Sequence, residues 1–254
     1  MSASAIGSDQ PLNSDGPQLP AVDYTNSRHP LRRVTTQFAL RARRRMYHSF
    51  MESLTPSAET TIVDIGVTPD QSTEDSNFLE KWYTYPGRIT ATSIEDASYL
   101  ESIHPGLKFV QTSGDHLPFA DRQFDIAFSS AVIEHVGDRA KQRRFIQELL
   151  RVSKRFFITT PDRRFPVELH TFLPLLHWLP QENHQRVLRA LGMTSWAKTE
   201  NLNLLDEHEL RDLFPAEVVP TIGGPRLLGM RSNLLASGLS HGDDGASSNA
   251  EGVG

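Results

Sequence analysis

Two short segments place a glutamate beside or close to a histidine. Glu134 directly precedes His135, and Glu168 and His170 lie in a later segment rich in aromatic and aliphatic residues. Histidine changes charge near neutral pH, so His135 and His170 are the candidate catalytic residues, each as a general base. The alternative is structural: the pair at 134–135 would organise a loop, and the histidines would bond to backbone groups.

The same four side chains have the types that bind a divalent ion. They belong to two separate loops, and the sequence does not show whether these loops meet. We therefore expect no metal ligand in this chain. The chain contains no cysteine, which excludes disulfides, thiolate metal sites and cysteine nucleophiles.

Strand and helix patterns alternate through the middle of the chain. Apolar, β-branched runs at 60–65, 88–92, 107–111, 124–129 and 155–160 predict strands, and amphipathic or polar runs at 76–83, 95–103 and 138–152 predict helices. This alternation is typical of a parallel sheet with helices on both faces. In such a sheet, ligands bind at the carboxyl ends of the strands.

The segment 114–136 carries the most specific pattern. It contains Gly-Asp, then Leu-Pro-Phe, then an Asp before a Phe-Asp strand, and ends on Glu-His. With this order of elements, residues 62–160 resemble the class I S-adenosylmethionine-dependent methyltransferases, type 11 subgroup. The resemblance implies a Rossmann-like α/β fold: a seven-stranded, mostly parallel sheet with helices on both faces and its last strand antiparallel. The implied cofactor is S-adenosyl-L-methionine.

The resemblance also implies a set of cofactor-binding residues after the third and fourth strands. Asp115 would accept a hydrogen bond from the adenine amine, the backbone of His116 would reach the ring edge, and Leu117 would provide an apolar wall. Ser129 and Ser130 would leave space for the methionine part of the cofactor. A turn or helix cap is the structural alternative for Asp115.

The loop after the first strand departs from the family pattern. Asp64 and Gly66 match it, but Thr68 stands where a second glycine is expected, and Pro69 removes a backbone donor. After the second strand, Ser93 stands where the family has the acidic residue that contacts the ribose, and Glu95 or Asp96 could substitute for it from slightly later in the chain. The resemblance therefore predicts a cofactor site with an altered first loop.

The chain divides into four predicted segments. Residues 1–27 and 237–254 are polar tails expected to be disordered. Residues 28–59 form a basic helical segment, with seven arginines between 28 and 45. Residues 60–236 form the methyltransferase domain, in which 161–205 are a substrate-lid insertion. Segments 217–222 and 232–236 would be the last two strands, an antiparallel pair at the sheet edge.

Net charge and hydropathy limit the classes of partner that we expect this protein to bind. The formal net charge is −5, which counts against a nucleic-acid binder, and no apolar run is long enough to cross a membrane. We expect a cytoplasmic enzyme that methylates an O or N of a small-molecule or glycan-like acceptor. The alternatives are a non-catalytic, methyltransferase-like scaffold and an RNA methyltransferase guided by the arginine-rich helix. The oligomeric state does not follow from the sequence.

Overall fold

The computed structural model describes residues 30–71, 76–168, 170–227 and 229–241. The predicted tail 1–27, and the predicted C-terminal tail from residue 242 onward, lie outside the described residues. Within the described residues, no helix combines the length and apolar character needed to span a bilayer.

A seven-stranded sheet forms the centre of the protein. Its spatial order is β3-β2-β1-β4-β5-β9-β6, and the first five of these strands run parallel while β9 is antiparallel to both of its neighbours. The predicted sheet, with its last strand antiparallel, is therefore confirmed. The strands are β1 (Ile62–Ile65), β2 (Ile89–Ser93), β3 (Lys108–Gln111), β4 (Phe124–Ser130), β5 (Ser153–Pro161), β6 (Thr221–Gly223) and β9 (Asn233–Leu239).

The predicted antiparallel pair at the sheet edge is formed by β6 and β9, with β6 as the outer strand. Two other details near the C-terminus differ from the sequence prediction. A small hairpin of β7 (Arg226–Leu227) and β8 (Met230–Arg231) separates the two strands. Strand β9 also runs to Leu239, past the boundary expected at residue 236, because all of its residues pair with residues 155–161 of β5.

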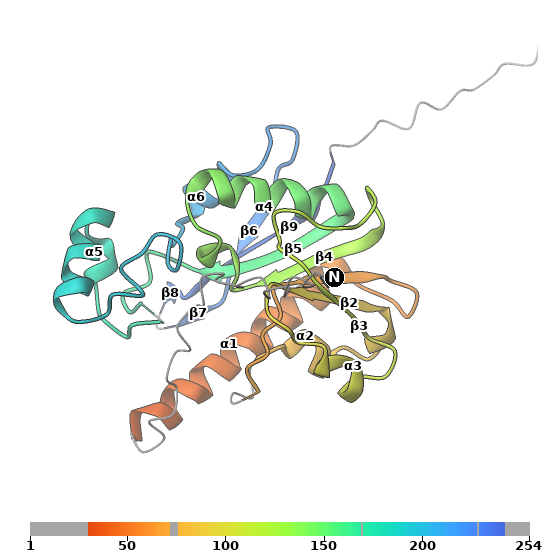
Figure 1. Ribbon diagram of the computed structural model, residues 1–254, viewed down its shortest axis with the longest axis horizontal. Coiled ribbons are helices and arrows are strands. Elements are labelled where there is room, and N and C mark those ends of the chain that lie inside the picture. The colour runs from red at the N-terminus through yellow and green to blue at the C-terminus, as the bar shows by residue number, and fades with distance from the viewer. Residues whose placement is uncertain (1–29, 72–75, 169, 228, 242–254) are drawn as a thin grey trace, which may run out of the picture.

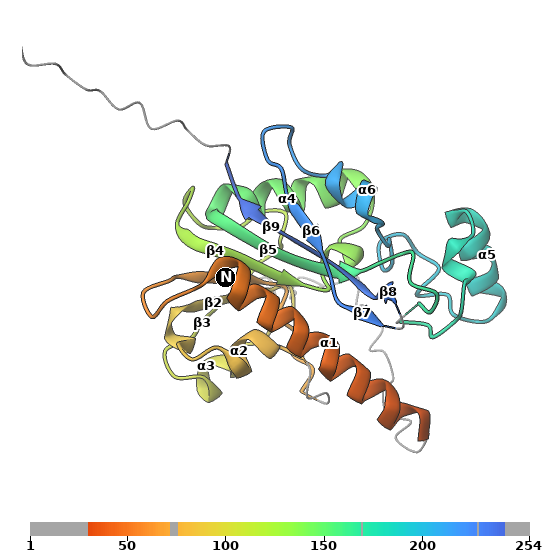
Figure 2. The same cartoon turned by 180° about the vertical axis from the view of Figure 1, so that it is seen from behind.

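Helices cover both faces of the sheet (Figure 1). On one face lie α1 (Pro30–Leu54), α2 (Phe78–Trp82) and α3 (Tyr99–Ile103); on the other lie α4 (Arg139–Val152) and α6 (Glu207–Arg211). Helix α5 (Gln181–Ala190) stands at one end of the molecule, away from the sheet, as the view from behind also shows (Figure 2). Short 3₁₀ turns occur at η1 (Pro86–Arg88), η2 (Ile133–His135) and η3 (Leu176–Trp178).

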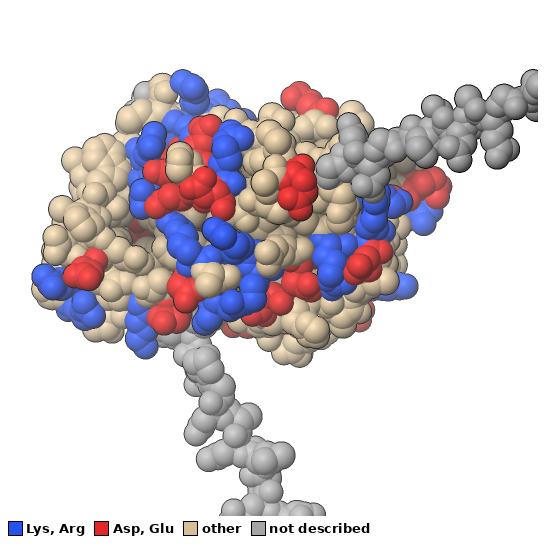
Figure 3. All heavy atoms as spheres, turned by 90° about the horizontal axis from the view of Figure 1, so that it is seen from above, with Lys and Arg blue, Asp and Glu red and all other residues tan. Residues whose placement is uncertain are grey.

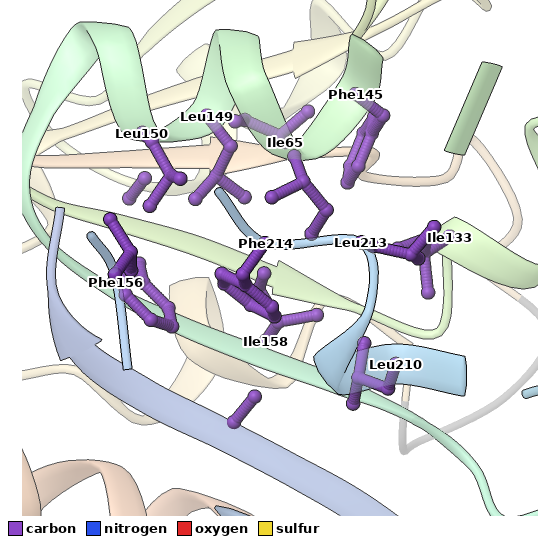
Figure 4. Close-up of a cluster of buried hydrophobic side chains, with 14 of the residues drawn as sticks. Ile65, Ile133, Phe145, Leu149, Leu150, Phe156, Ile158, Leu210, Leu213 and Phe214 are labelled. Atoms are coloured by element: carbon purple, nitrogen blue, oxygen red, sulfur yellow. The ribbon is translucent and has the colours of Figure 1, made fainter. Parts of the chain in front are cut away.

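The helix with the clearest apolar stripe in the sequence packs as that stripe predicts. Phe145, Leu149 and Leu150 of α4 point toward the sheet and are buried (Figure 4). The Asp138 side chain caps the helix by accepting a hydrogen bond from the Lys141 amide at 2.9 Å. Strand β4 leads into this helix through η2, so the position of Glu134 and His135 depends on how firmly α4 is packed.

The basic helix α1 is part of the same domain. Met46, Phe50 and Leu54 are buried on the face opposite α4, in a cluster that includes Ile62 of β1 and Phe157 of β5. Arg41, Arg44 and Arg45 are exposed, and Arg43 is half-buried. The helix therefore acts as one layer of the fold, and it brings a cation to the carboxyl ends of the strands.

Candidate functional site at the strand ends

Two carboxyl groups lie buried at the end of β1. Asp64 is 6% exposed and Glu80, from α2, is 2% exposed. Burial, followed by the nearby charge of Glu80, raises the pKa of Asp64 well above its ordinary value. Burial also raises the pKa of Glu80. Among the described residues, no side chain other than Asp64 lies within hydrogen-bonding reach of the Glu80 carboxylate. A buried acidic pair with so few donors suits a ligand that brings a positive charge.

Gly66 turns the chain immediately after β1. Its φ is +100°, and a Cβ added there would lie 2.3 Å from Cγ2 of Val132. The amide of Gly66 donates to the Thr92 carbonyl at 2.8 Å, and the next amide, of Val67, donates to the same oxygen at 3.1 Å. Glycine is required here for conformation and for space, which agrees with the sequence interpretation of this position.

A single asparagine holds the unusual loop that follows. The Asn77 side chain accepts from the Thr68 amide at 2.9 Å and donates to the Thr68 carbonyl at 2.8 Å. The Thr68 hydroxyl in turn accepts from the Asp70 amide at 3.1 Å. The loop thus keeps a defined shape with Thr68 in place of a glycine. No sequence pattern singled out Asn77.

The residues predicted to hold the nucleoside part lie after β2 and β3. Glu95 and Asp115 are both exposed; the Glu95 amide is bonded to the Ser93 hydroxyl at 3.2 Å, and Asp115 is bonded to Ser113. Because β2 and β3 are paired in register from Thr90–Lys108 to Ser93–Gln111, their ends open on the same edge.

The two residues after Asp115 differ in burial. The His116 side chain is exposed, and its amide donates to the Ser113 carbonyl at 3.2 Å. Leu117 is buried, consistent with an apolar wall, and its amide donates to the Glu148 carboxylate at 2.9 Å. These assignments to the cofactor stay predictions.

The serines at the end of β4 bond to the neighbouring strands and to helix α1. Ser129 is buried, and its hydroxyl donates to the Ile65 carbonyl of β1 at 2.8 Å. Ser130 is less buried and bonds the Thr159 hydroxyl of β5 at 2.8 Å. Arg43 of α1 donates to the Ser130 hydroxyl at 2.7 Å and lies 5.5 Å from the centre of the Phe78 ring. Sequence reasoning recognised the basic helix, but it did not identify Arg43 as its contact with the site.

The two candidate bases meet at the ends of β4 and β5. The rings of His135 and His170 are 4.8 Å apart, centre to centre, and nearly perpendicular. Trp196 packs beside both, with its ring 5.1 Å from His170 and 6.2 Å from His135. The His135 Nδ1 donates to the Asn201 carbonyl, with 2.7 Å between the two atoms. The segment 161–205 therefore does cover this edge of the sheet.

Glu168 holds His170 in place. One Glu168 oxygen accepts from the His170 Nδ1 at 2.6 Å, and the other accepts from the Thr171 amide and hydroxyl. Burial works against the charged form of Glu168, but these donors outweigh it and lower its pKa to about 2. Burial likewise disfavours the charged form of His170, and the bond and charge of Glu168 reverse the effect and raise its pKa. Burial lowers the pKa of His135.

Glu134 is fully buried behind the two rings. Its Oε2 accepts from the Thr160 hydroxyl at 2.9 Å, whereas Oε1 has no hydrogen-bond partner in the described part of the chain and lies 3.9 Å from the His135 Nε2. The Glu134 backbone carbonyl accepts from the Asn203 amide. The structure thus brings together the two loops that the sequence could not relate to one another.

His177 has a different environment. Its Nε2 donates to the Phe165 carbonyl at 2.8 Å, as the structural interpretation of the histidines proposed. A cavity of about 530 Å³ lies on this side of α4 and is lined by His177, His184 and Arg163, among others. None of the residues predicted for the cofactor or for catalysis lines this cavity.

Comparison with known proteins finds a family model that resembles the central part of the chain. Residues 64–156 match the family model described as a methyltransferase domain. The chain is 27% identical over 133 residues to the chloroplastic tocopherol O-methyltransferase of Arabidopsis thaliana, a match that covers 51% of this chain. The same match covers 36% of that protein, so it relates the chain to only about a third of this relative's length.

Solved structures share the fold at low identity. The 1,6-didemethyltoxoflavin-N1-methyltransferase of Burkholderia thailandensis superposes with a TM-score of 0.54 at 15% identity, covering 80% of this chain and 79% of that one. A Rhodobacter sphaeroides protein described as a putative Zn-dependent alcohol dehydrogenase superposes with a TM-score of 0.51 at 13% identity, covering 76% and 88%. At such identities these likenesses show the fold alone. Residues 64–156, a little over a third of the chain, are therefore similar to a methyltransferase domain, as the sequence resemblance predicts.

Proposed function

We propose that this protein is an S-adenosylmethionine-dependent methyltransferase that acts on an O or N of a small-molecule acceptor, glycan-like acceptors included. The observation that carries the proposal is the edge formed by the ends of β1 and β4. There the buried pair of Asp64 and Glu80 lies inside the segment that matches the methyltransferase model, and Arg43 contacts Ser130 of that segment.

The residues present fit the cofactor. The buried acidic pair of Asp64 and Glu80 suits the α-ammonium group of the methionine part, and both Glu80 oxygens are buried with few donors. Arg43, beside Ser130, suits its carboxylate. Gly66 allows backbone to approach the ligand closely, and Asp115 is assigned to the adenine amine on the strength of the family resemblance.

The cofactor supplies a methyl group on a sulfonium, and the protein positions the acceptor in line with it and keeps water away. Trp196 offers an apolar surface over which the acceptor can lie, beside His135 and His170. Because the His135 Nδ1 donates to a carbonyl, its Nε2 is the atom able to take a proton from an acceptor hydroxyl or amine. The His170 Nδ1 likewise donates to Glu168, which leaves the His170 Nε2 able to take a proton.

The named chemistry of the relatives supports a small-molecule acceptor of either kind. One relative is a tocopherol O-methyltransferase, and one structural neighbour is a 1,6-didemethyltoxoflavin-N1-methyltransferase. Both names give a small molecule as the acceptor. We extend this class of acceptor to the present chain.

Calorimetry with S-adenosylhomocysteine tests the proposal. We expect micromolar binding to the wild-type protein, and binding at least about tenfold weaker in Asp115→Ala, which loses one charge-assisted hydrogen bond. The matched control is Asp212→Ala, at an exposed aspartate that directly follows α6. No binding at millimolar ligand would overturn the enzyme assignment and favour the scaffold alternative, which the altered loop at Thr68 and Pro69 motivates. Full affinity in Asp115→Ala would remove that residue from the site.

A further inference from the structure

We infer that Glu134, His135 and His170 form a binding site for a divalent first-row transition metal ion, with zinc as the foremost candidate. One side-chain ligand atom from each of the three residues lies within 4.8 Å of the other two. Glu134 and His135 come from η2, after β4, and His170 follows β5, so two neighbouring strands deliver the ligands to one edge of the sheet.

Both imidazole rings are already oriented for metal binding. The acceptor of the His135 Nδ1 is a backbone carbonyl, which can only accept, so this nitrogen carries a proton. The Nδ1 of His170 faces a Glu168 oxygen, and Glu168 also accepts from the Thr171 amide, the Thr171 hydroxyl and the His170 amide. Histidines that bind metal usually donate their second N–H to such oxygens, which leaves Nε2 as the ligand atom.

Glu134 supplies the independent observation that points to a ligand. Its side chain is fully buried, yet Oε1 has no hydrogen-bond partner among the described residues. A buried carboxylate oxygen without a donor is costly, and a cation beside it removes that cost. The second oxygen is held by Thr160, so the carboxylate is oriented with Oε1 on the histidine side.

The donor set selects the kind of ion. Two imidazole nitrogens and one carboxylate oxygen bind zinc in catalytic sites that keep an open position, and the same set binds iron(II). Magnesium and calcium prefer oxygen ligands throughout. In tetrahedral geometry the ligand atoms stand about 3.3 Å apart, so the three side chains need to close by roughly 1.5 Å at most. Arg43 opposes a cation here, but Glu134 and Glu168 outweigh its single charge.

The metal site and the base role of the histidines use the same Nε2 lone pairs. The histidines can therefore act as bases only in the metal-free protein. Ion binding can be measured without any methyl transfer, so the metal site and the proposed function can fail separately.

Titration of the chelator-treated, untagged protein with zinc chloride tests the site. Calorimetry should show one ion per chain, and cobalt(II) should give the visible absorption bands of a low-coordinate site. In His170→Gln and Glu134→Gln we expect affinity to fall by at least about 100-fold, because each variant removes a direct ligand. Glu168→Gln, which only positions His170, should weaken binding by about 10- to 100-fold.

The matched control is His208→Gln. His208 pairs with Asp212 at 3.0 Å on α6, so it is also a histidine–carboxylate pair, but it is exposed and isolated. Circular dichroism identifies variants that fold. If Glu134→Gln does not fold, His170→Gln decides, together with a zinc-dependent rise in melting temperature that the wild type shows and the variant lacks. Unchanged affinity in His170→Gln, an equal loss in the control, or no binding by the wild type would each overturn the site.

Discussion

Asp64 and Glu80 illustrate how a single buried pair can serve a site at the expense of stability. The two carboxyl groups are almost fully inaccessible and close enough for the charge of Glu80 to raise the pKa of Asp64. When both are ionised, they repel each other in a medium that solvates them poorly. Such an arrangement is typical of a position kept for a ligand, since an amide or an apolar residue would pack there at lower cost.

This pair should make stability depend on pH. The pKa of each group is raised on folding, so its contribution to stability is full below about pH 4 and is lost as the pH rises through the folded value. In Glu80→Gln less stability should be lost as the pH rises, because one of the two ionisable groups is absent. Relative to the wild type, we expect the variant to gain about 1.4 kcal/mol of unfolding free energy for each unit by which the folded pKa was raised.

Urea denaturation of the ligand-free protein at about pH 5 and about pH 8 measures this gain. Glu52→Gln, at an exposed position of α1, is the control and should follow the wild type at both pH values. A difference between Glu80→Gln and the wild type that is the same at both pH values would contradict the assignment.

Gly66 makes a steric prediction at the same scale. In Gly66→Ala the new methyl group would meet Val132 at 2.3 Å, on a backbone with φ of +100°. We expect the free energy of unfolding to fall by about 1–3 kcal/mol and the affinity for S-adenosylhomocysteine to fall with it. Gly192→Ala is the control, because Gly192 also has a positive φ but nothing within 4 Å of an added Cβ. Equal losses in both variants would show that the contact with Val132 is unimportant.

Among the elements, α1 brings Arg43 to the ends of the strands. It covers the sheet face opposite α4, as Figures 1 and 2 show from both sides. The ring of Phe50 lies 5.2 Å from Phe128 and 5.5 Å from Phe157, edge to face in both cases. Since Phe50 and Arg43 are two turns apart on one helix, the packing of the aromatic ring sets the position of the arginine at Ser130.

Phe50→Ala should therefore destabilise the whole domain. Removing a fully buried phenylalanine costs about 3–5 kcal/mol, from lost transfer energy and the cavity left behind. Chemical denaturation measures this loss. Glu52→Ala, two residues away on the exposed side, should change stability by less than about 0.5 kcal/mol. A small effect of Phe50→Ala would mean that α1 is only loosely attached to the sheet.

At the scale of the whole molecule, the charged groups are interspersed. On the face in Figure 3, lysine and arginine side chains alternate with aspartate and glutamate. Ion pairs such as Arg139–Glu209 at 2.8 Å and Arg163–Asp206 at 3.1 Å link α4 and the segment after β5 to α6. A face of mixed sign is not typical of a surface that binds phosphate backbones. That nucleic acid is not the partner stays a prediction.

The shared core predicts cooperative unfolding. Residues of α1, α2 and five of the central strands meet in one apolar cluster, and α4 and α6 contribute to the second cluster on the other face of the same sheet. We expect one thermal transition whose calorimetric and van't Hoff enthalpies agree. Two resolved transitions would contradict this and would separate the basic helix or the segment 161–205 from the sheet.

Much of the fold was predictable because its signals are local. The β-branched runs, the 3.6-residue stripe of α4 and the prolines and glycines at the strand ends are all read within a few residues. They located the five parallel strands to within a residue or two. The strand β6 was predicted less well, since 217–222 contains Pro220 and only Thr221–Gly223 pairs with β9.

The sequence by itself determined the resemblance to methyltransferases, the sheet and the candidate residues Asp64, Gly66, His135 and His170. Only the tertiary structure decided which of them meet. Arg43 reaches Ser130 across 87 positions of sequence, and Thr160 reaches Glu134 across 26. The sequence predicts only that Glu80 belongs to a helix, and the structure buries it beside Asp64. Such pairings depend on strand order and helix packing, which no local pattern encodes. For that reason no metal ligand was expected from the sequence, whereas the fold brings Glu134, His135 and His170 close to one another.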